Sequence, residues 1–169
     1  MVVYATSEPE EALLLGGETA LLDDGNVRQF GKTSEIYRNP ITLSASQIFS
    51  DPPINHALVE KKGNRIHFNE VEWDLPKKFQ GLTDGDYQVA IRPHHVLPNQ
   101  GHGATIPISG RVGVSELSGS ESSAHFEFDN NSWVSLAHGV HPYTRGSDHT
   151  FYLNPDKCMY FTIDGQRAA

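Results

Sequence analysis

Residues 106–137 of this 169-residue chain read IPISGRVGVSELSGSESSAHFEFDNNSWVSLA. Strand-like runs occupy 106–116, 122–128 and 132–137. Between them, at 117–120 and 129–131, lie residues that favour tight turns. This stretch therefore predicts three short β-strands in succession.

The strand pattern extends over most of the chain beyond residue 53. Turn residues such as those at 62–64 and 83–86 separate the runs. Short strands at this spacing are typical of a small barrel, because closing a sheet removes its exposed edges. The additional strands are predicted at 56–61, 64–69, 86–91, 148–153 and 159–163.

The segment before residue 50 alternates between strand and helix signals. Residues 1–5 are uncharged and partly β-branched, which predicts a buried strand. Ser7 and Glu10 fit a capping box, so a helix is predicted from there to residue 15, ended by Gly16 and Gly17. A hairpin over 19–30, turning at 23–26, and short helices at 33–37 and 44–49 complete this segment.

The proline-rich link at 51–53 divides these two patterns. The predicted fold class is mainly β. Residues 1–50 form a short α/β segment, and residues 51–169 form a β-barrel domain.

Composition and charge restrict the possible partners. Hydrophobic residues make up 37% of the chain, and 21 Asp and Glu against 13 Lys and Arg give a net charge of −8. An acidic chain opposes long-range attraction to nucleic acid or anionic lipid. The longest apolar run, 12–15, is far too short to span a membrane, and no signal peptide is visible, so a cytosolic protein is expected.

Two short motifs superficially resemble nucleotide-binding elements. Residues 25–33 carry the glycines and the Lys-Thr pair of a P-loop, but five residues separate the glycines where the motif needs four. Residues 117–120 echo the signature of ATP-binding cassette proteins, yet they lie between two predicted strands. A strand and a turn are therefore the better interpretations.

Nine histidines raise the question of a metal site. His94 and His95 are adjacent, and on a strand they would face opposite sides and could not chelate together. His102, His138 and His141 lie near glycines, without a cysteine pair or a helical His-x-x-x-His. Surface histidines and no metal ligands are expected, although a site assembled from loops stays open.

No catalytic constellation emerges from the other polar residues. Serines occur without a Gly-x-Ser-x-Gly elbow, and Cys158, the single cysteine, is expected to be a core or edge residue rather than a nucleophile. Glu70 and Glu72 alternate with Val71 and Trp73, as on a solvated strand. The chain is not expected to be an enzyme, and no catalytic residue is assigned.

Several segments, in the right order, resemble the C-terminal part of the ATP-binding subunit of bacterial sugar-type ATP-binding cassette importers. YATSEPEEA at 4–12 is similar to the switch segment of that family. Together with the residues that follow, this sequence is closest to a glycerol-type branch of the family. AIRPHHV at 90–96 is similar to an element of the transport-associated barrel, the TOBE domain. Further similar segments are 24–31, EIYRNP at 35–40, 48–55, 110–112, ELSGSE at 116–121 and DGQR at 164–167.

The resemblance implies a barrel of the oligonucleotide-binding (OB) or molybdate-binding (MOP) type after the last elements of an ATPase domain. It places the Walker A, signature and Walker B motifs before residue 1, so this chain is expected to have no ATPase activity and no cofactor. ATP and magnesium are implied for a longer parent. Ser7 stands where the family carries the switch histidine, which indicates a weak or degenerate ATPase half that pairs with a competent subunit.

The function implied is a regulatory and dimer-contacting segment of an importer for a sugar, polyol or glycerol-type solute. A second ATP-binding subunit and membrane permease subunits are the implied partners, at the inner face of the cell membrane. The apolar faces of residues 2–5 and 20–22 would have no neighbouring element packed against them, so self-association is expected. The residues expected at a ligand-binding or regulatory surface are Arg92, His94, His95, Glu116 and Gly119.

Two alternatives stay open. One is a stand-alone barrel that binds a small ligand or an oxyanion, with backbone amides of the turn at 117–121 as donors. The other is a barrel that binds single-stranded nucleic acid, which needs aromatic platforms in a basic groove, whereas core packing explains the aromatic residues more simply. The aromatic residues in question are Trp73, Phe79, Tyr87, Phe126 and Phe128.

Overall fold

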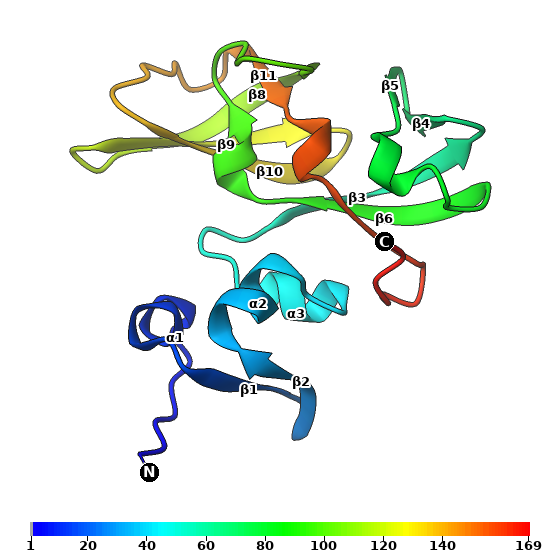
Figure 1. The fold of residues 1–169 in the computed structure, drawn as a ribbon. Helices are drawn as coiled ribbons and strands as arrows, with labels where there is room; N and C mark the ends of the chain where they lie inside the picture. Colours follow the sequence, from blue (N-terminus) through cyan, green and yellow to red (C-terminus); the bar gives the residue numbers. More distant parts are fainter. Residues whose placement is uncertain (1) are drawn as a thin grey trace.

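The computed structural model of the protein describes residues 2–169. Its ribbon has two parts, a smaller one with three helices and a hairpin, and a larger one with two antiparallel sheets (Figure 1). The N-terminus lies at the free end of the smaller part, and the C-terminus lies where the two parts meet. The prediction of a mainly β fold preceded by a short α/β segment is confirmed.

The smaller part is built on a β-hairpin. The turn between its strands places Asp24 and Gly25 at positive φ, 50° and 74°, a conformation that Asp and Gly accept readily. Its small core contains Leu21, Ile36 and Phe49. The elements, as predicted apart from their ends, are α1 (Pro9–Leu15), β1 (Glu18–Asp23), β2 (Asn26–Lys32), α2 (Thr33–Arg38) and α3 (Leu43–Ile48).

The strand predicted at 1–5 is wrong for the described residues 2–5, while Met1 lies outside them. These residues form no strand, and Val2 is 93% and Val3 83% exposed. An isolated strand gains nothing in water without a neighbour to complete its hydrogen bonds. Within the described chain no other strand pairs with this segment.

The capping box predicted for Ser7 and Glu10 is also wrong. The N-cap of α1 is Glu8, which makes no side-chain cap, and the Ser7 hydroxyl instead donates to the Glu8 carboxylate over 3.4 Å. The amide of Glu8 donates to the hydroxyl of Thr6 at 2.9 Å. The helix begins at Pro9, whose fixed φ suits a first turn, and ends at Gly16 as predicted.

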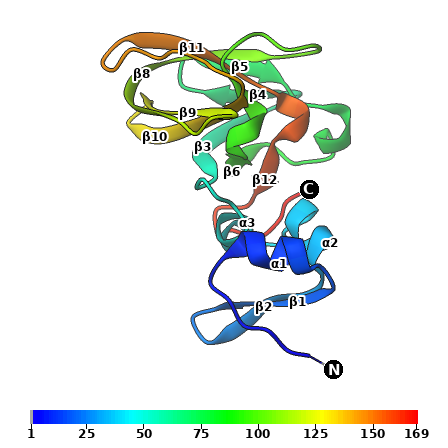
Figure 2. The ribbon, with the colours of Figure 1, turned by 90° about the vertical axis from the view of Figure 1, so that its left-hand side faces the viewer.

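The larger part consists of two five-stranded antiparallel sheets, seen side-on in Figure 2. Of the short strands, β5 lies where the alternation at 70–73 indicated a solvated strand, and β7 is additional to those predicted. The first sheet has the order β12-β6-β3-β4-β5, from β3 (Asn55–Lys62), β4 (Arg65–Phe68), β5 (Val71–Asp74), β6 (Gly85–Ile91) and β12 (Met159–Phe161). The second has the order β10-β9-β8-β11-β7, from β7 (Val96–Leu97), β8 (Ile106–Leu117), β9 (Glu121–Phe128), β10 (Asn131–His138) and β11 (Asp148–Leu153).

A single apolar core lies between these sheets and makes the larger part barrel-like. The aromatic residues considered above as nucleic-acid platforms belong to it: four are buried and Phe128 packs against them partly buried. Phe126 stacks on Phe151 with ring centroids 4.0 Å apart. Core packing therefore accounts for these aromatic side chains.

Asn55 joins the two sheets. It is 2% exposed at the start of β3, and its side-chain amide pairs with the backbone of Val134 in β10. Its Nδ2 donates to the Val134 carbonyl at 2.7 Å, and its Oδ1 accepts from the Val134 amide at 2.6 Å. The side chain thus acts as a short piece of backbone that continues the hydrogen bonding from one sheet to the other.

The C-terminal segment connects the larger part back to the smaller one. The amide of Leu43 donates to the carbonyl of Gly165 at 2.8 Å, and the amide of Arg167 donates to the carbonyl of Ile41 at 2.8 Å. Leu43 also packs against a small apolar cluster that contains Ile54 and Phe161. Among the helices of the described residues, none is long and apolar enough to cross a membrane.

Candidate functional site

The five residues predicted for a ligand-binding surface fall into two separate places. Arg92, His94 and His95 lie at the end of β6 and in the 3-10 turn η2 (Pro93–His95) that follows it. Glu116 lies on β8 and lines a different hollow of about 380 Å³, beside His125. Gly119 is in the exposed turn after β8, with φ of 70°. The structure therefore does not assemble them into one site.

Arg92 was expected at the surface of the barrel, and this placement is wrong. The residue is 6% exposed. Its guanidinium donates to the carbonyls of Tyr37, at 2.7 Å, and Phe49, and stacks over the Tyr37 ring at 3.8 Å. Arg92 therefore holds the smaller part against the larger one, and burial lowers its pKa.

The argument that His94 and His95 would face opposite sides on a strand does not apply to them. They lie in a 3-10 turn and not in a strand, because Pro93 sets its first position. Their rings are in contact, with centroids 4.2 Å apart. Burial lowers the pKa of His94, and it lowers the pKa of His95 to about 4, with further contributions from nearby cationic groups. Both rings are therefore neutral at pH 7.

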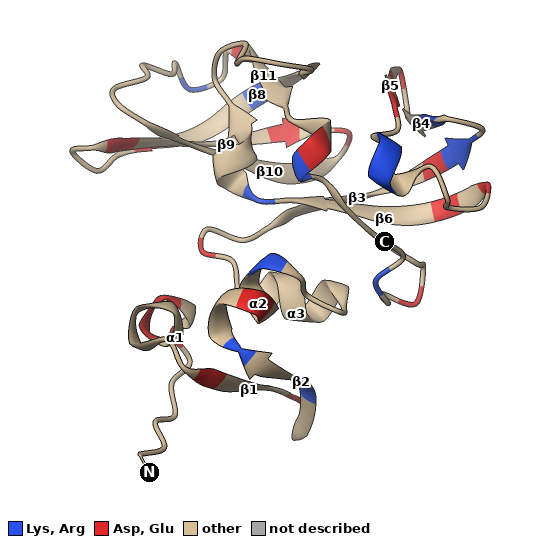
Figure 3. Ribbon diagram, in the orientation of Figure 1, with Lys and Arg blue, Asp and Glu red and all other residues tan. Residues whose placement is uncertain are grey.

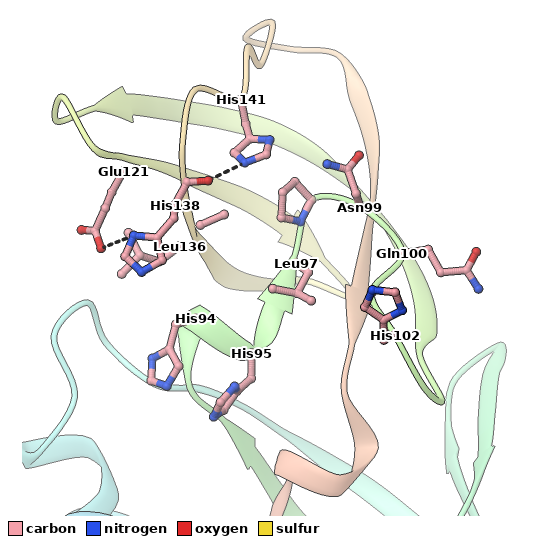
Figure 4. Close-up of a pocket in the computed structure, with 13 residues that line it drawn as sticks. His94, His95, Leu97, Asn99, Gln100, His102, Glu121, Leu136, His138 and His141 are labelled. Atoms are coloured by element: carbon pink, nitrogen blue, oxygen red, sulfur yellow. Dashed lines mark hydrogen bonds and ion pairs between the residues drawn. The ribbon is translucent and has the colours of Figure 1, made fainter.

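These two rings line a cleft of about 740 Å³, together with three histidines from other segments (Figure 4). We call it the histidine cleft. His138 Nδ1 lies 3.5 Å from a carboxylate oxygen of Glu121, and His141 Nε2 lies 2.9 Å from the His138 carbonyl. The third, His102, comes from the loop before β8. Histidines widely spaced in the sequence thus line one cleft.

The histidine cleft offers five imidazoles, one carboxylate and two side-chain amides beside an apolar wall. Asn99 and Gln100 supply the amides, and Leu97 and Leu136 belong to the wall. Within residues 2–169 no three His, Cys, Asp or Glu side chains are arranged to hold a metal ion.

A second cleft, of about 270 Å³, lies where the two parts of the molecule meet. We call it the junction cleft. It shares His94 and His95 with the histidine cleft, and Asp156 is the carboxylate that lines it. Sequence reasoning named Arg92, His94 and His95 but missed the other lining residues, because they come from four further segments of an acidic chain. Its basic residues are Arg38, Lys78, Arg92, Lys157 and Arg167.

Three other sequence interpretations are settled by the geometry. Cys158 is a buried core residue, and burial raises the pKa of its thiol to about 12, so it carries no reactive thiolate. Residues 26–32 of the P-loop-like motif form strand β2. In the turn after β8, the amides of Ser118 and Ser120 donate to the carbonyls of Glu121 and Ser118 at 2.9 and 2.8 Å. These two amides are therefore not free to bind an oxyanion.

Comparison with known proteins identifies relatives but no family model that matches. The chain is 29% identical over 175 residues to the maltose/maltodextrin import ATP-binding protein MalK of Photorhabdus laumondii, a match that covers 97% of the chain and 46% of that protein. It is 28% identical to MalK of Escherichia coli K12 and of Salmonella typhimurium, again over 97% of the chain. The chain spans about half the length of these curated relatives. Over nearly all of its own length, the chain is thus similar to the ATP-binding protein of a sugar importer, as its motifs predicted.

Proposed function

We propose that this chain is the regulatory and dimer-contacting segment of an importer's ATP-binding subunit. The observation that carries the proposal is the match to MalK, which includes 97% of this chain and under half of the relative. A mainly β part with a short α/β segment before it agrees with the C-terminal part of such a subunit. The solute would be a sugar, a polyol or a glycerol-type molecule.

The chain itself would not hydrolyse ATP. Its P-loop-like residues pair with β1 as strand β2, so their amides cannot encircle a phosphate. Ser7, at the family's switch position, is exposed and bonds only its neighbour Glu8. ATP and magnesium would be held by the part of the relatives that this chain does not match, and phosphoryl transfer needs both in place.

The partners follow from the same proposal. A second ATP-binding subunit would compensate for Ser7, which cannot carry the positive charge of a histidine. Permease subunits would hold the complex at the inner face of the cell membrane. The alternative of a stand-alone oxyanion-binding barrel loses support at the turn after β8, since two of its amides already donate within the turn.

The proposal is tested in the cells that encode the chain. The protein is tagged at its C-terminus and purified from detergent-solubilised membranes, and uptake of labelled glycerol, a polyol and maltose is measured with and without codons 55–169. We expect permease and ATP-binding subunits to copurify, and the regulation or rate of uptake of one solute to change on deletion. Recovery of the protein alone, with uptake of all three solutes unchanged, would reject the proposal.

Hydrolysis by the purified chain is a separate test. Phosphate release from ATP and magnesium should equal that of a buffer blank. Turnover above the blank, lost after further purification, would indicate contamination. Turnover that stays with the chain would show that it holds a nucleotide site.

A further inference from the structure

Positive charge is concentrated in the junction cleft. Five of the 13 lysines and arginines of the chain line about 270 Å³, in a molecule whose net charge is −8. Elsewhere in the ribbon, acidic and basic residues are interspersed (Figure 3). Like charges repel at short range, so such a cluster is costly unless something negative offsets it.

The protein provides little negative charge to these residues. Among the described residues none of the five forms an ion pair, whereas Arg28, Lys61 and Arg65 elsewhere each do. Lys78 donates to a backbone carbonyl, that of Asp156, at 2.7 Å, and Arg92 also donates to carbonyls. Carbonyl dipoles satisfy hydrogen bonds, but they leave the charge uncompensated.

One donor in this cluster has no partner at all. Arg167 donates through Nε to the carbonyl of Ala169, while its Nη1 is buried and makes no hydrogen bond within residues 2–169. A buried donor without an acceptor is destabilising, and more so when it is charged. The remaining cations, Arg38 and Lys157, make no side-chain hydrogen bond or ion pair within the same residues and leave their donors available.

We propose that the junction cleft binds a small anion of the phosphate class, either inorganic phosphate or the phosphate group of a small ester. Guanidinium and ammonium groups donate several charge-assisted hydrogen bonds to such an anion. His94 adds a neutral imidazole at the rim. The size of the cleft suits a small molecule, and the acidic surface of the chain as a whole disfavours nucleic acid.

Binding there would tie together segments that are distant in the chain. Arg38 ends α2 in the smaller part, Lys157 ends the 3-10 turn before β12, and Arg167 belongs to the C-terminal segment. An anion held by all three would stabilise the contact between the two parts. That this contact then regulates an importer rests on the proposed function, whereas the binding itself does not.

The test is calorimetric titration of the purified chain at neutral pH and constant ionic strength. The probes are inorganic phosphate, glycerol 3-phosphate and, as an uncharged comparison, glycerol. Both phosphates are expected to release heat with a stoichiometry near one site, and glycerol none. A tighter Kd for glycerol 3-phosphate would identify an ester as the ligand, and an equal Kd would identify free phosphate.

Matched variants locate the site. Lys157→Ala should weaken phosphate binding by about tenfold, since one charge-assisted contact is lost. Lys77→Ala removes an equal charge from an exposed neighbour of Lys78 that does not line the cleft, and it should leave the Kd unchanged. Circular dichroism and thermal midpoints confirm that both variants fold.

A second readout uses the histidine at the rim. The side-chain NMR signals of His94 should shift on addition of phosphate, and those of the exposed His56 should not. Absence of heat and of shifts at millimolar phosphate would overturn the proposal, as would equal losses in both lysine variants. Either result leaves the copurification experiment on the importer untouched, so the two proposals fail separately.

Discussion

At residue 110 the backbone of β8 passes too close to its neighbour for any side chain. A Cβ placed on Gly110 would lie 2.4 Å from Phe126 Cδ2 and 2.7 Å from the carbonyl oxygen of Glu127. Gly110→Ala is therefore expected to destabilise the chain by about 1–3 kcal/mol, as overpacking does. Urea unfolding measures the change. Gly113→Ala is the matched control, because its Cβ would meet the nearest atom at an ordinary 3.7 Å. Equal costs for both would show that β8 and β9 are not so closely packed.

The half-buried imidazole of His95 predicts a loss of stability in acid. The unfolded chain takes up this proton at the ordinary histidine pKa of 6.5, while the folded chain does so only near 4, so protons favour the unfolded state between these values. The contribution is complete above pH 6.5 and is lost as pH falls toward 4. His95→Gln, which cannot take up the proton, should show a shallower fall in thermal midpoint over this range, and His56→Gln, at an exposed position, should follow the wild type. A slope in His95→Gln as steep as in wild type would contradict the burial argument.

Between elements, the side chain of Asn55 joins β3 to β10 where no backbone ladder does. Asn55→Ala would leave the amide and carbonyl of Val134 buried without partners, so a loss of about 1–3 kcal/mol is expected. Hydrogen exchange should quicken at Val134 in particular. Asn99→Ala, in an exposed loop, is the control and should cost little. An unchanged exchange rate at Val134 in Asn55→Ala would show that the sheets do not depend on this pair.

Sequence patterns predicted those elements whose causes are local. Gly25 and its acidic neighbours predict the turn of the first hairpin, and the Gly16–Gly17 pair predicts the end of α1. The segment 2–5 has the composition of a strand, but a strand exists only with a partner, which a local pattern does not contain. The strand predicted at 86–91 does end at residue 91 as β6, and Pro93 begins the 3-10 turn that follows it.

The two clefts show why the site was harder to predict than the fold. The sequence Arg-Pro-His-His at 92–95, with its adjacent histidines, was predicted to contribute to a ligand-binding surface, and both clefts meet there. The residues that complete these clefts, such as His141 and Lys157, lie far away in the sequence and carry no motif. Only the return of the chain through β12 to the smaller part brings Lys157 and Arg167 beside Arg92. Contacts of this range depend on topology rather than on spacing.

At the scale of the whole molecule, the outer face of the β1–β2 hairpin is apolar and exposed. Ala20 pairs with Phe30 and Leu22 with Val27 across the strands, and Phe30 and Leu22 are 64% and 63% exposed. Burying such a face in a second copy gains about 25 cal/mol for each Å² of apolar surface. We therefore expect the chain to self-associate at about 50 µM, a concentration at which even a modest contact is populated.

Sedimentation velocity measures whether the chain self-associates. A pair of variants then tests whether the hairpin face forms the contact. Phe30→Glu should shift the distribution toward monomer, because it places a charge in the centre of the contact. Leu58→Glu puts the same charge on an exposed apolar residue of β3, 55% exposed, and should leave the distribution as in wild type. If both variants dissociate the protein equally, the effect is one of net charge. If wild type is monomeric throughout, the hairpin face stays exposed to water in this chain and the predicted self-association is wrong.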